Sequence, residues 1–329
     1  MQPSTKPQKL SAKMKKQNEF VIIDTYFKTE YNNNNNSIIT GIGDDAAVVQ
    51  IPAGKQLCIS TDTLIPNQHF PKATSPADIA YKAFQVNLSD MAAMGAAPRW
   101  ISLNLTMPKY SHPWLSRFST ELKKNLNLYD MALIGGDTTC GKLSITITIY
   151  GLVDSHKFLK RDGAKNQDEI YVSGPIGEAA LGLQMIQNKF PQDDFFIKRL
   201  NRPIARVELG QILTEYASSC IDISDGLLQD LSHILQASHL GATIDIKNLI
   251  QNSKIKNICS KTKTKNLILY GGDDYELLFT LPKNKINTVR EKHPEITKKI
   301  QKIGTIVNKK GVFIDGKILK IKGYQHFSN

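Results

Sequence analysis

Hydrophobic and polar residues alternate with a period of two along residues 100–107 and 143–153, and this alternation predicts two strands with one buried face. Residues 76–95 instead space small and apolar side chains at helical intervals, and residues 114–126 are amphipathic with the same period. The first half of the chain is therefore expected to combine long strands with helices that cover them.

Shorter patterns of both kinds follow along the whole chain. We expect further strands at 38–51, 56–64, 132–134, 169–173, 220–223, 242–246, 276–281, 300–307 and 311–321, and further helices at 177–187, 203–216 and 227–237. Because strands and helices mix with hairpin-like returns, the pattern favours an α+β or mixed α/β fold over a doubly wound sheet.

The length of 329 residues predicts two domains. Residues 1–17 form a polar, lysine-bearing tail that we expect to be disordered. The polar stretch around 154–168 predicts a boundary between an N-terminal domain at 18–155 and a C-terminal domain at 156–329.

Acidic residues recur in short segments rich in Gly, Ser and Thr, each beside a strand-like or helical run. The segments are Gly-Ile-Gly-Asp-Asp-Ala at 41–46, Ser-Thr-Asp-Thr at 60–63, Asn-Leu-Ser-Asp at 87–90, Gly-Gly-Asp-Thr-Thr at 135–139, Asp-Ile-Ser-Asp-Gly at 222–226 and Gly-Gly-Asp-Asp-Tyr-Glu at 271–276. Carboxylate and hydroxyl oxygens are the ligands that Mg²⁺ prefers, and glycines let a backbone approach a phosphate closely. A single segment of this kind could equally be an ordinary turn or a helix cap, and Asp90 and Asp225 look most like such caps. Six such segments together indicate a site for metal ions and nucleotide phosphates.

Two familiar phosphate motifs are nearly matched and do not fit. Residues 41–46 match the dinucleotide pattern GxGxxA, but a strand pattern follows where that motif requires a helix. Residues 136–143 approach a Walker A loop, but Leu143 occupies the position of the Mg²⁺-binding Ser or Thr. Phosphate chemistry in this chain therefore uses another scaffold.

The formal net charge of +12 raises the question of nucleic-acid binding. Residues 246–329 hold 18 Lys and Arg against 6 Asp and Glu, and residues 1–16 hold five Lys and no acid. The motif-bearing body at 17–245 therefore has 19 basic and 24 acidic residues and is mildly acidic. The lysines are scattered without aromatic partners, which does not favour a nucleic-acid site. There is no apolar run long enough for a membrane span, and the N-terminus lacks an apolar signal core. Four widely spaced cysteines favour free thiols in the cytoplasm.

Taken in order, the motifs resemble those of the thiamine-monophosphate kinase family. The resemblance adds His69-Phe70, Ile-Ser-Asp-Gly-Leu at 223–227, Asp-Tyr-Glu-Leu at 274–277 and the ending Gly-Tyr-Gln-His-Phe at 323–327, and it covers nearly everything beyond the basic tail. It implies the two-domain fold of aminoimidazole ribonucleotide synthetase, in which N-terminal domains pair into a dimeric β-barrel. It also implies ATP-dependent phosphorylation of thiamine monophosphate to thiamine diphosphate.

The resemblance further assigns roles to individual residues. It implies Mg²⁺ ligands at Asp45, Ser60, Thr61, Asp62, Asp90, Asp137 and Asp222, with Asp225 binding a further ion. Gly136, Asp137, Arg161 and Ser224 would contact ATP, and His69, Glu276 and Tyr324 would form the thiamine-monophosphate pocket. Asp273 departs from the family, which commonly has Glu there.

We expect direct in-line transfer without a protein general base, because the attacking phosphate oxygen is already largely ionised near pH 7. Metal ions and positioning would then carry catalysis, with no catalytic side chain. The alternatives are sister ATP-dependent enzymes of the same fold, which make aminoimidazole ribonucleotide or selenophosphate. Selenophosphate synthesis calls for a reactive cysteine near the N-terminus, and the first cysteine here is Cys58, inside a predicted strand. A non-catalytic nucleotide- or RNA-binding protein would instead tolerate loss of the aspartates.

Overall fold

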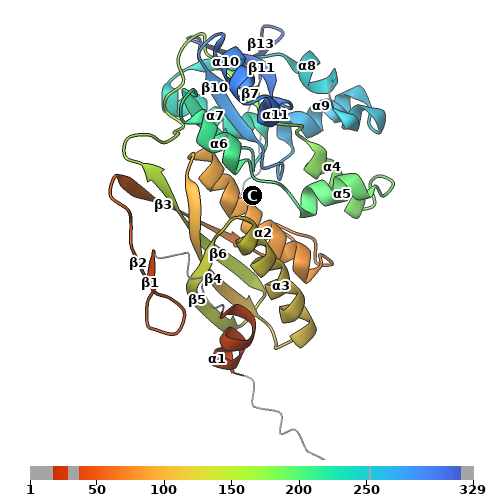
Figure 1. Ribbon diagram of the computed structural model, residues 1–329. Helices are drawn as coiled ribbons and strands as arrows, with labels where there is room; N and C mark the ends of the chain where they lie inside the picture. The colour runs from red at the N-terminus through yellow and green to blue at the C-terminus, as the bar shows by residue number, and fades with distance from the viewer. Residues whose placement is uncertain (1–17, 29–36, 252, 320–329) are drawn as a thin grey trace, which may run out of the picture.

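The computed structural model describes residues 18–28, 37–251 and 253–319, so the predicted tail and Tyr324 lie outside the described residues. Two β-sheets organise these residues into two halves, with helix α2 (Pro76–Ala93) lying where the halves meet (Figure 1). The four-stranded sheet forms the lower half in this view, and a seven-stranded sheet forms the upper half.

The first half is built on a sheet of order β3-β6-β4-β5, in which β4 and β5 run parallel and the other neighbours antiparallel. Its elements in chain order are α1 (Glu19–Ile22), the π-helix η1 (Ile23–Phe27), β1 (Ile38–Thr40), β2 (Val48–Val49), β3 (Lys55–Leu64), α2, β4 (Ala97–Met107), α3 (His112–Leu128), β5 (Ala132–Cys140) and β6 (Ser144–Asp154).

The period of two predicted along β6 is observed in its burial. Ile145, Ile147 and Ile149 are fully buried under α2 and α3, while the residues between them face the other side of the sheet. Helix α2 begins where Ser75 accepts a hydrogen bond from the Asp78 backbone N–H at 3.1 Å, a typical N-cap. The amphipathic patterns of this half therefore decide which face of its sheet is covered.

The opposite face of the four-stranded sheet is open along β3. Leu57 and Ile59 are 40% and 56% exposed there, although both are apolar. The short β1–β2 hairpin packs over Trp100 at another part of this face. The apolar side chains of Leu57 and Ile59 are thus left without a covering element among the described residues.

The second half is a mixed sheet of order β13-β12-β9-β11-β7-β10-β8, antiparallel except between β9 and β12. Its elements are β7 (Glu169–Val172), α4 (Glu178–Ile186), α5 (Asp194–Asn201), α6 (Val207–Leu213), β8 (Ser219–Asp222), α7 (Leu227–Ser238), β9 (Gly241–Ile244), α8 (Ile246–Gln251), the 3₁₀ helix η2 (Lys254–Asn257), α9 (Lys261–Tyr270), β10 (Leu277–Leu281), α10 (Lys285–Lys292), α11 (Pro294–Thr297), β11 (Gln301–Val307), β12 (Gly311–Ile314) and β13 (Lys317–Ile318).

The two halves share one apolar cluster at the end of α2. Ala92 and Ala93 of α2 pack with Leu209 of α6 and with Tyr171 and Phe279 of the second sheet. Helix α6 approaches so closely that a Cβ on Gly210 would lie 2.0 Å from the Ala92 carbonyl oxygen. The small residues predicted along α2 therefore serve this close contact between the halves.

Several predicted boundaries were wrong. The expected strand at 38–51 is two short strands joined by the 41–47 segment, and the strand at 311–321 is broken by a turn at 315–316. The expected helix at 203–216 begins only at Val207, after Pro203. Strand β5 continues to Cys140, so the 135–139 segment lies inside a strand instead of a turn.

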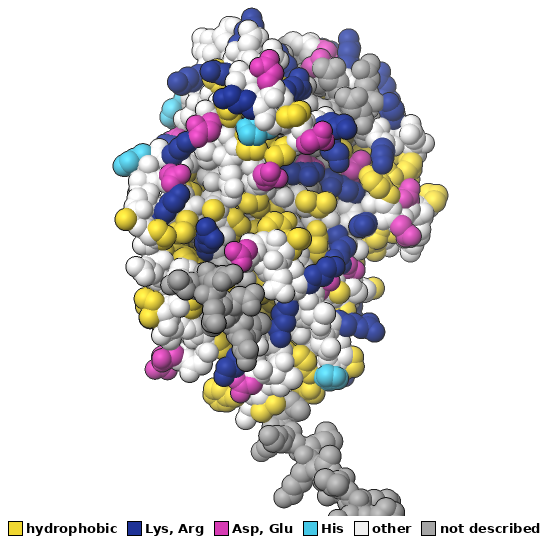
Figure 2. All heavy atoms as spheres, viewed as in Figure 1, with side chains coloured by type: hydrophobic (Ala, Val, Ile, Leu, Met, Phe, Trp, Pro, Cys, Tyr) yellow, Lys and Arg dark blue, Asp and Glu magenta, His cyan; other side chains and the backbone are white. Residues whose placement is uncertain are grey.

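The view in Figure 2 shows Lys and Arg side chains spread over both halves and interspersed with acidic and neutral groups. None of the helices in the described ranges is long and apolar enough to cross a membrane.

Candidate functional site

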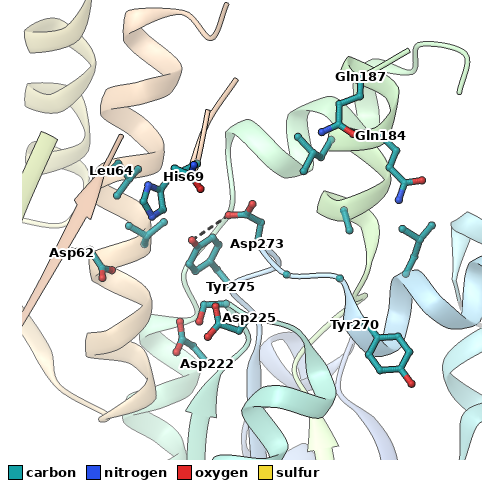
Figure 3. Close-up of a pocket in the computed structure, with 18 of the residues that line it drawn as sticks. Asp62, Leu64, His69, Gln184, Gln187, Asp222, Asp225, Tyr270, Asp273 and Tyr275 are labelled. Carbon is teal, nitrogen blue, oxygen red and sulfur yellow. Dashed lines mark hydrogen bonds between the residues drawn. The ribbon is translucent and has the colours of Figure 1, made fainter. Parts of the chain in front are cut away.

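A cavity of about 530 Å³ lies between the two halves, and both halves line it. The first half contributes β3, residues 68–69 and α2, and the second contributes α4, α9 and the segments after β8 and α9. Figure 3 shows Asp62 and His69 on one side, with Asp222, Asp225 and Tyr275 extending from the other half. Motifs far apart in the sequence therefore meet here.

Three carboxylates from three different elements form the acidic end of this cavity. Asp62 lies on the α2 side of β3, where its backbone N–H donates to the Asn87 side-chain oxygen at 3.2 Å. Asp90 in the last turns of α2 accepts a hydrogen bond from Ser60 at 2.5 Å. Asp222 ends β8 and is buried. These positions are inside regular elements, so the Asp90 carboxylate is not the helix cap that a local pattern suggested.

Burial and the charge of Asp90 disfavour the ionised forms of Asp62 and Asp222. Burial, followed by the charge of Asp90, raises the pKa of Asp62 to about 6. Burial and then Asp90 also raise the pKa of Asp222 to about 7, despite a hydrogen bond from Ser89 at 2.7 Å. Burial raises the pKa of Asp90, although Ser60 and the charge of Arg161 oppose the shift. The cluster is therefore short of positive charge.

The segment after β8 brings Ser224 and Asp225 to the cavity wall. Asp230, one turn into α7, accepts hydrogen bonds from the backbone N–H groups of Asp225 and Gly226, both at 3.1 Å. Burial and then Asp222 raise the pKa of Asp230 to about 8. The Asp230 carboxylate thus holds the backbone at the N-terminus of α7, and the Asp225 side chain lines the cavity. Sequence reasoning missed Asp230, whose only signal was an acid four residues after Gly226.

His69 lies on the first-half side of the cavity, in the segment between β3 and α2. Its Nδ1 accepts a hydrogen bond from the Ile65 backbone N–H at 3.0 Å. A neutral imidazole bonded in this way carries its proton on Nε2. His69 is therefore arranged as a hydrogen-bond donor through Nε2.

Glu276 is fully buried behind the 271–275 segment and is absent from the described residues that line the cavity. Its carboxylate accepts hydrogen bonds from Arg206 at 2.7 and 2.5 Å, from Arg199 at 3.1 Å and from Ser173 at 2.5 Å. Burial alone would raise the pKa of Glu276, but the two arginines lower it. Glu276 therefore lies behind the 271–275 segment and is held there by ion pairs with two arginines.

A second cavity of about 700 Å³ holds another group of predicted residues: Asp45, Gly136 and Asp137. Its other walls come from α1, η1 and the 41–47 segment. Gly136 has φ +139°, and a Cβ there would lie 1.9 Å from the Leu103 carbonyl oxygen, so only glycine fits. Backbone contact within the sheet is thus sufficient to require glycine at position 136.

Strand pairing places the two cavities on opposite sides of the first sheet. Asp62 shares a row of paired residues with Ile147 and Leu103, both buried under α2. Asp137 pairs with Asn104 in the next row, whose side chains face the other way. Three strand spacings of about 4.8 Å also separate β3 from β5. Within one chain, Asp62 and Asp137 therefore cannot hold the same ion.

The predicted site residues fall into five groups. The predicted residues that line the first cavity are Asp62, His69, Asp90, Asp222, Ser224 and Asp225. Ser60 donates a hydrogen bond to Asp90, and the charge of Arg161 opposes the rise in the pKa of Asp90 and Asp222. Asp45, Gly136 and Asp137 line the second cavity. Thr61 lies on the open face, where its hydroxyl donates to Thr148 at 2.9 Å. Glu276 is buried, and Tyr324 lies outside the described residues.

The chemistry of the donors fits divalent cations that are shared with a phosphate ligand. Across the described ranges, no three His, Cys, Asp or Glu side chains converge as a complete metal site. Mg²⁺, however, is usually held by one or two carboxylates, with waters and substrate phosphates completing its shell. Burial and the charge of Asp90 raise the pKa values of Asp62 and Asp222, and a cation would stabilise the ionised form of both carboxylates.

Comparison with known proteins places both halves in one family. Residues 43–153 match the N-terminal domain of AIR synthase related proteins, and residues 165–317 match the C-terminal domain. The thiamine-monophosphate kinase of Buchnera aphidicola subsp. Schizaphis graminum is 45% identical over 94% of this chain and 99% of its own.

Two solved structures extend the similarity to three dimensions. Thiamine-monophosphate kinase from Stenotrophomonas maltophilia K279a is 37% identical, with a TM-score of 0.81 over 86% of this chain and 93% of its own. AaThiL complexed with AMPPCP and TMP is 32% identical, with a TM-score of 0.75 over 87% of this chain and 92% of its own.

Proposed function

This chain belongs to the thiamine-monophosphate kinases of the AIR synthase related family, and from that premise we infer that it transfers the γ-phosphoryl group of ATP to thiamine monophosphate. The product is thiamine diphosphate. The observation that carries the inference is the convergence of Asp62, Asp90 and Asp222 at one cavity between the halves. The sister activities on aminoimidazole ribonucleotide and selenophosphate are not favoured, since relatives matching over most of the chain are thiamine-monophosphate kinases.

We assign the metal sites to the carboxylates and hydroxyls predicted from the sequence. Asp62, Asp90, Asp222 and Asp225 would hold Mg²⁺ at the first cavity together with Ser60, and Asp45, Thr61 and Asp137 would contribute from the open face. When bound, Mg²⁺ neutralises the carboxylates and the phosphate oxygens beside them. Without Mg²⁺ the carboxylates of the cavity would repel an anionic substrate, so turnover should require Mg²⁺.

The side chains around the cations bind and orient the two substrates. Arg161 and Ser224, with Gly136 and Asp137, are proposed to contact ATP, and Arg161 suits a phosphate because its guanidinium is always charged. His69 can donate from Nε2 to the acceptor, with Tyr324 completing the pocket and Glu276 supporting it through its arginines.

The phosphoryl transfer itself needs no protein base. The terminal phosphate oxygen of thiamine monophosphate is already ionised near pH 7 and attacks the γ-phosphorus in line with the leaving oxygen of ADP. A phosphorylated His69 is not supported, because hydrogen bonding of Nδ1 to Ile65 leaves the proton on Nε2. Positioning and charge neutralisation therefore account for catalysis.

We also propose a homodimer in which the open faces of two first sheets pair into a β-barrel. Support comes from the exposed Leu57 and Ile59 on the open face. Pairing of open faces would bring Thr61 and Asp137 of the two copies together between the two sheets. We place the domains at 18–155 and 156–329, and the four free thiols accord with a cytoplasmic location.

The proposal is tested by incubating the full chain with ATP, Mg²⁺ and thiamine monophosphate and following thiamine diphosphate by chromatography. Free thiamine serves as the control acceptor. Thiamine diphosphate formed from the monophosphate, with no product from thiamine, is the expected result. ATP binding without that product would redirect the search to the sister ATP-dependent activities of the fold.

A further inference from the structure

Lys82 of α2 is a lysine buried inside the molecule, with its side chain 1% exposed. An ammonium group is costly to remove from water unless its donors find partners. Its Nζ donates to the His69 carbonyl oxygen at 2.8 Å and forms an ion pair with Asp273 Oδ1 at 2.8 Å. The mechanism described above makes no use of this cation.

The two partners of Lys82 belong to opposite walls of the first cavity. His69 follows β3 in the first half, whereas Asp273 lies between α9 and β10 in the second (Figure 3). Both residues line the cavity. One buried ammonium therefore joins two substrate-facing segments that come from different halves of the chain.

The segment that carries Asp273 has a conformation that needs such anchors. Asp273 has φ +69° and Tyr275 has φ +52°, both in the left-handed region that side chains rarely adopt. On the second-half side, Asp274 accepts a hydrogen bond from the Gly177 backbone N–H at 2.5 Å, and Glu276 is bound by its arginines. Lys82 supplies the anchor from the first half.

The ion pair also fixes the direction of the Asp273 carboxylate. Its Oδ1 forms the ion pair with Lys82 and also accepts a hydrogen bond from the Tyr275 hydroxyl at 3.2 Å. Within the described ranges, Oδ2 has no hydrogen-bond donor, and the side chain stays 28% exposed at the cavity. One oxygen is thus held by the protein while the other is presented to the cavity.

We propose that Lys82 is a positioning residue for the acceptor substrate: it sets the spacing of His69 and Asp273 and the orientation of the Asp273 carboxylate. The inference rests on the proposed function, since a phosphorylated, cationic heterocycle is the ligand that these groups would receive. Neutralising Lys82 should loosen the acceptor side of the cavity. Arg161 and Ser224, the residues proposed to contact ATP, are not partners of Lys82. The Asp273 backbone N–H donates to the Ser224 carbonyl oxygen at 2.8 Å without Lys82, so ATP binding should be unaffected.

The test compares Lys82→Met and Lys82→Gln with the wild-type full chain. Gln removes the charge but retains a hydrogen-bond donor for the His69 carbonyl oxygen. If the Met variant does not fold, the Gln variant still tests the role of the charge. Lys72→Met, which removes an exposed lysine from the segment that connects β3 to α2 and carries His69, is the matched control. We expect KM for thiamine monophosphate to rise about tenfold, as for the loss of about 1.4 kcal/mol, with KM for ATP within about twofold of wild type.

A double-variant cycle with Asp273→Asn links the effect to the ion pair. The double variant Lys82→Met/Asp273→Asn should raise KM for thiamine monophosphate no further than the stronger single variant, because both substitutions remove the same ion pair. An active wild type with unchanged KM in the Lys82 variants, or additive effects in the cycle, would overturn the positioning role. A wild type that forms no thiamine diphosphate would instead overturn the proposed function and this inference with it.

Discussion

Replacing Asp62 by asparagine should stabilise the metal-free protein while removing its activity. Burial and Asp90 raise the pKa of Asp62 from an ordinary value near 3.9 to about 6. Two pKa units correspond to about 3 kcal/mol of unfavourable interaction in the ionised form. Because water reaches part of this side chain and Asn must still be buried, we expect a gain of roughly 1–3 kcal/mol near pH 7.

The pH dependence of this gain follows from the direction of the shift. A raised folded-state pKa means that the protonated group stabilises the fold below its unfolded pKa, and that this stability is lost as pH rises through about 6. The metal-free wild type should therefore lose stability between about pH 4 and pH 6. The difference between Asp62→Asn and wild type should grow over the same interval.

The assay is urea unfolding in EDTA and again in saturating Mg²⁺, with Mg²⁺-dependent turnover measured in parallel. Asp130→Asn is the matched control, since Asp130 is exposed in a left-handed turn that Asn also adopts. Saturating Mg²⁺ at 100 times its Kd would stabilise the wild type by about 2.7 kcal/mol, and the variant by less. A less stable variant in EDTA, or normal turnover at matched Mg²⁺, would refute the assignment.

Three further substitutions test separate parts of the account. Glu276→Gln should cost about 3 kcal/mol of stability by removing the acid that pairs with the half-buried Arg206 and by leaving Arg199 with Glu178 alone, measured by urea unfolding against the exposed control Glu208→Gln. Because Glu276 has a lowered pKa, this loss should be present above its ordinary pKa and disappear as pH falls through the lowered value. Ile59→Asp should convert a dimer to a folded monomer in sedimentation experiments, whereas Ile318→Asp, at a residue 67% exposed on β13, should not. His69→Gln should raise KM for thiamine monophosphate about tenfold and leave KM for ATP unchanged, and equal changes in both would contradict its place in the acceptor pocket.

The elements predicted from the sequence were those whose pattern directly reflects burial. The isoleucines of β6 and the small residues of α2 face a core, so their spacing gave the correct strand and helix. Helices α5 and α10 were missed because each has only eight residues, and helices of this length depend on tertiary contacts for their stability. The acidic segment at 60–63 lies within the strand predicted at 56–64, whereas the segment at 135–139 was expected to be a turn after a strand at 132–134 and instead continues β5.

The candidate site was predictable by residue type and not by arrangement. The motif containing Asp62 and that containing Asp137 look alike in sequence, but strand register places them on opposite faces of one sheet. That register includes a bulge between Ile101 and Ser102, which no local pattern reveals. Lys82 and Asp230 were missed because their partners lie at the cavity, and their own neighbours read as ordinary helix.

Direct transfer from ATP to thiamine monophosphate is the central claim, and a single-turnover experiment with γ-³²P-labelled ATP tests it most directly. Label should appear in the terminal phosphate of thiamine diphosphate in one phase, only with Mg²⁺ present, and no labelled protein should precede it in acid-quenched samples. Label that appears first on the protein, or only in inorganic phosphate, would contradict the account.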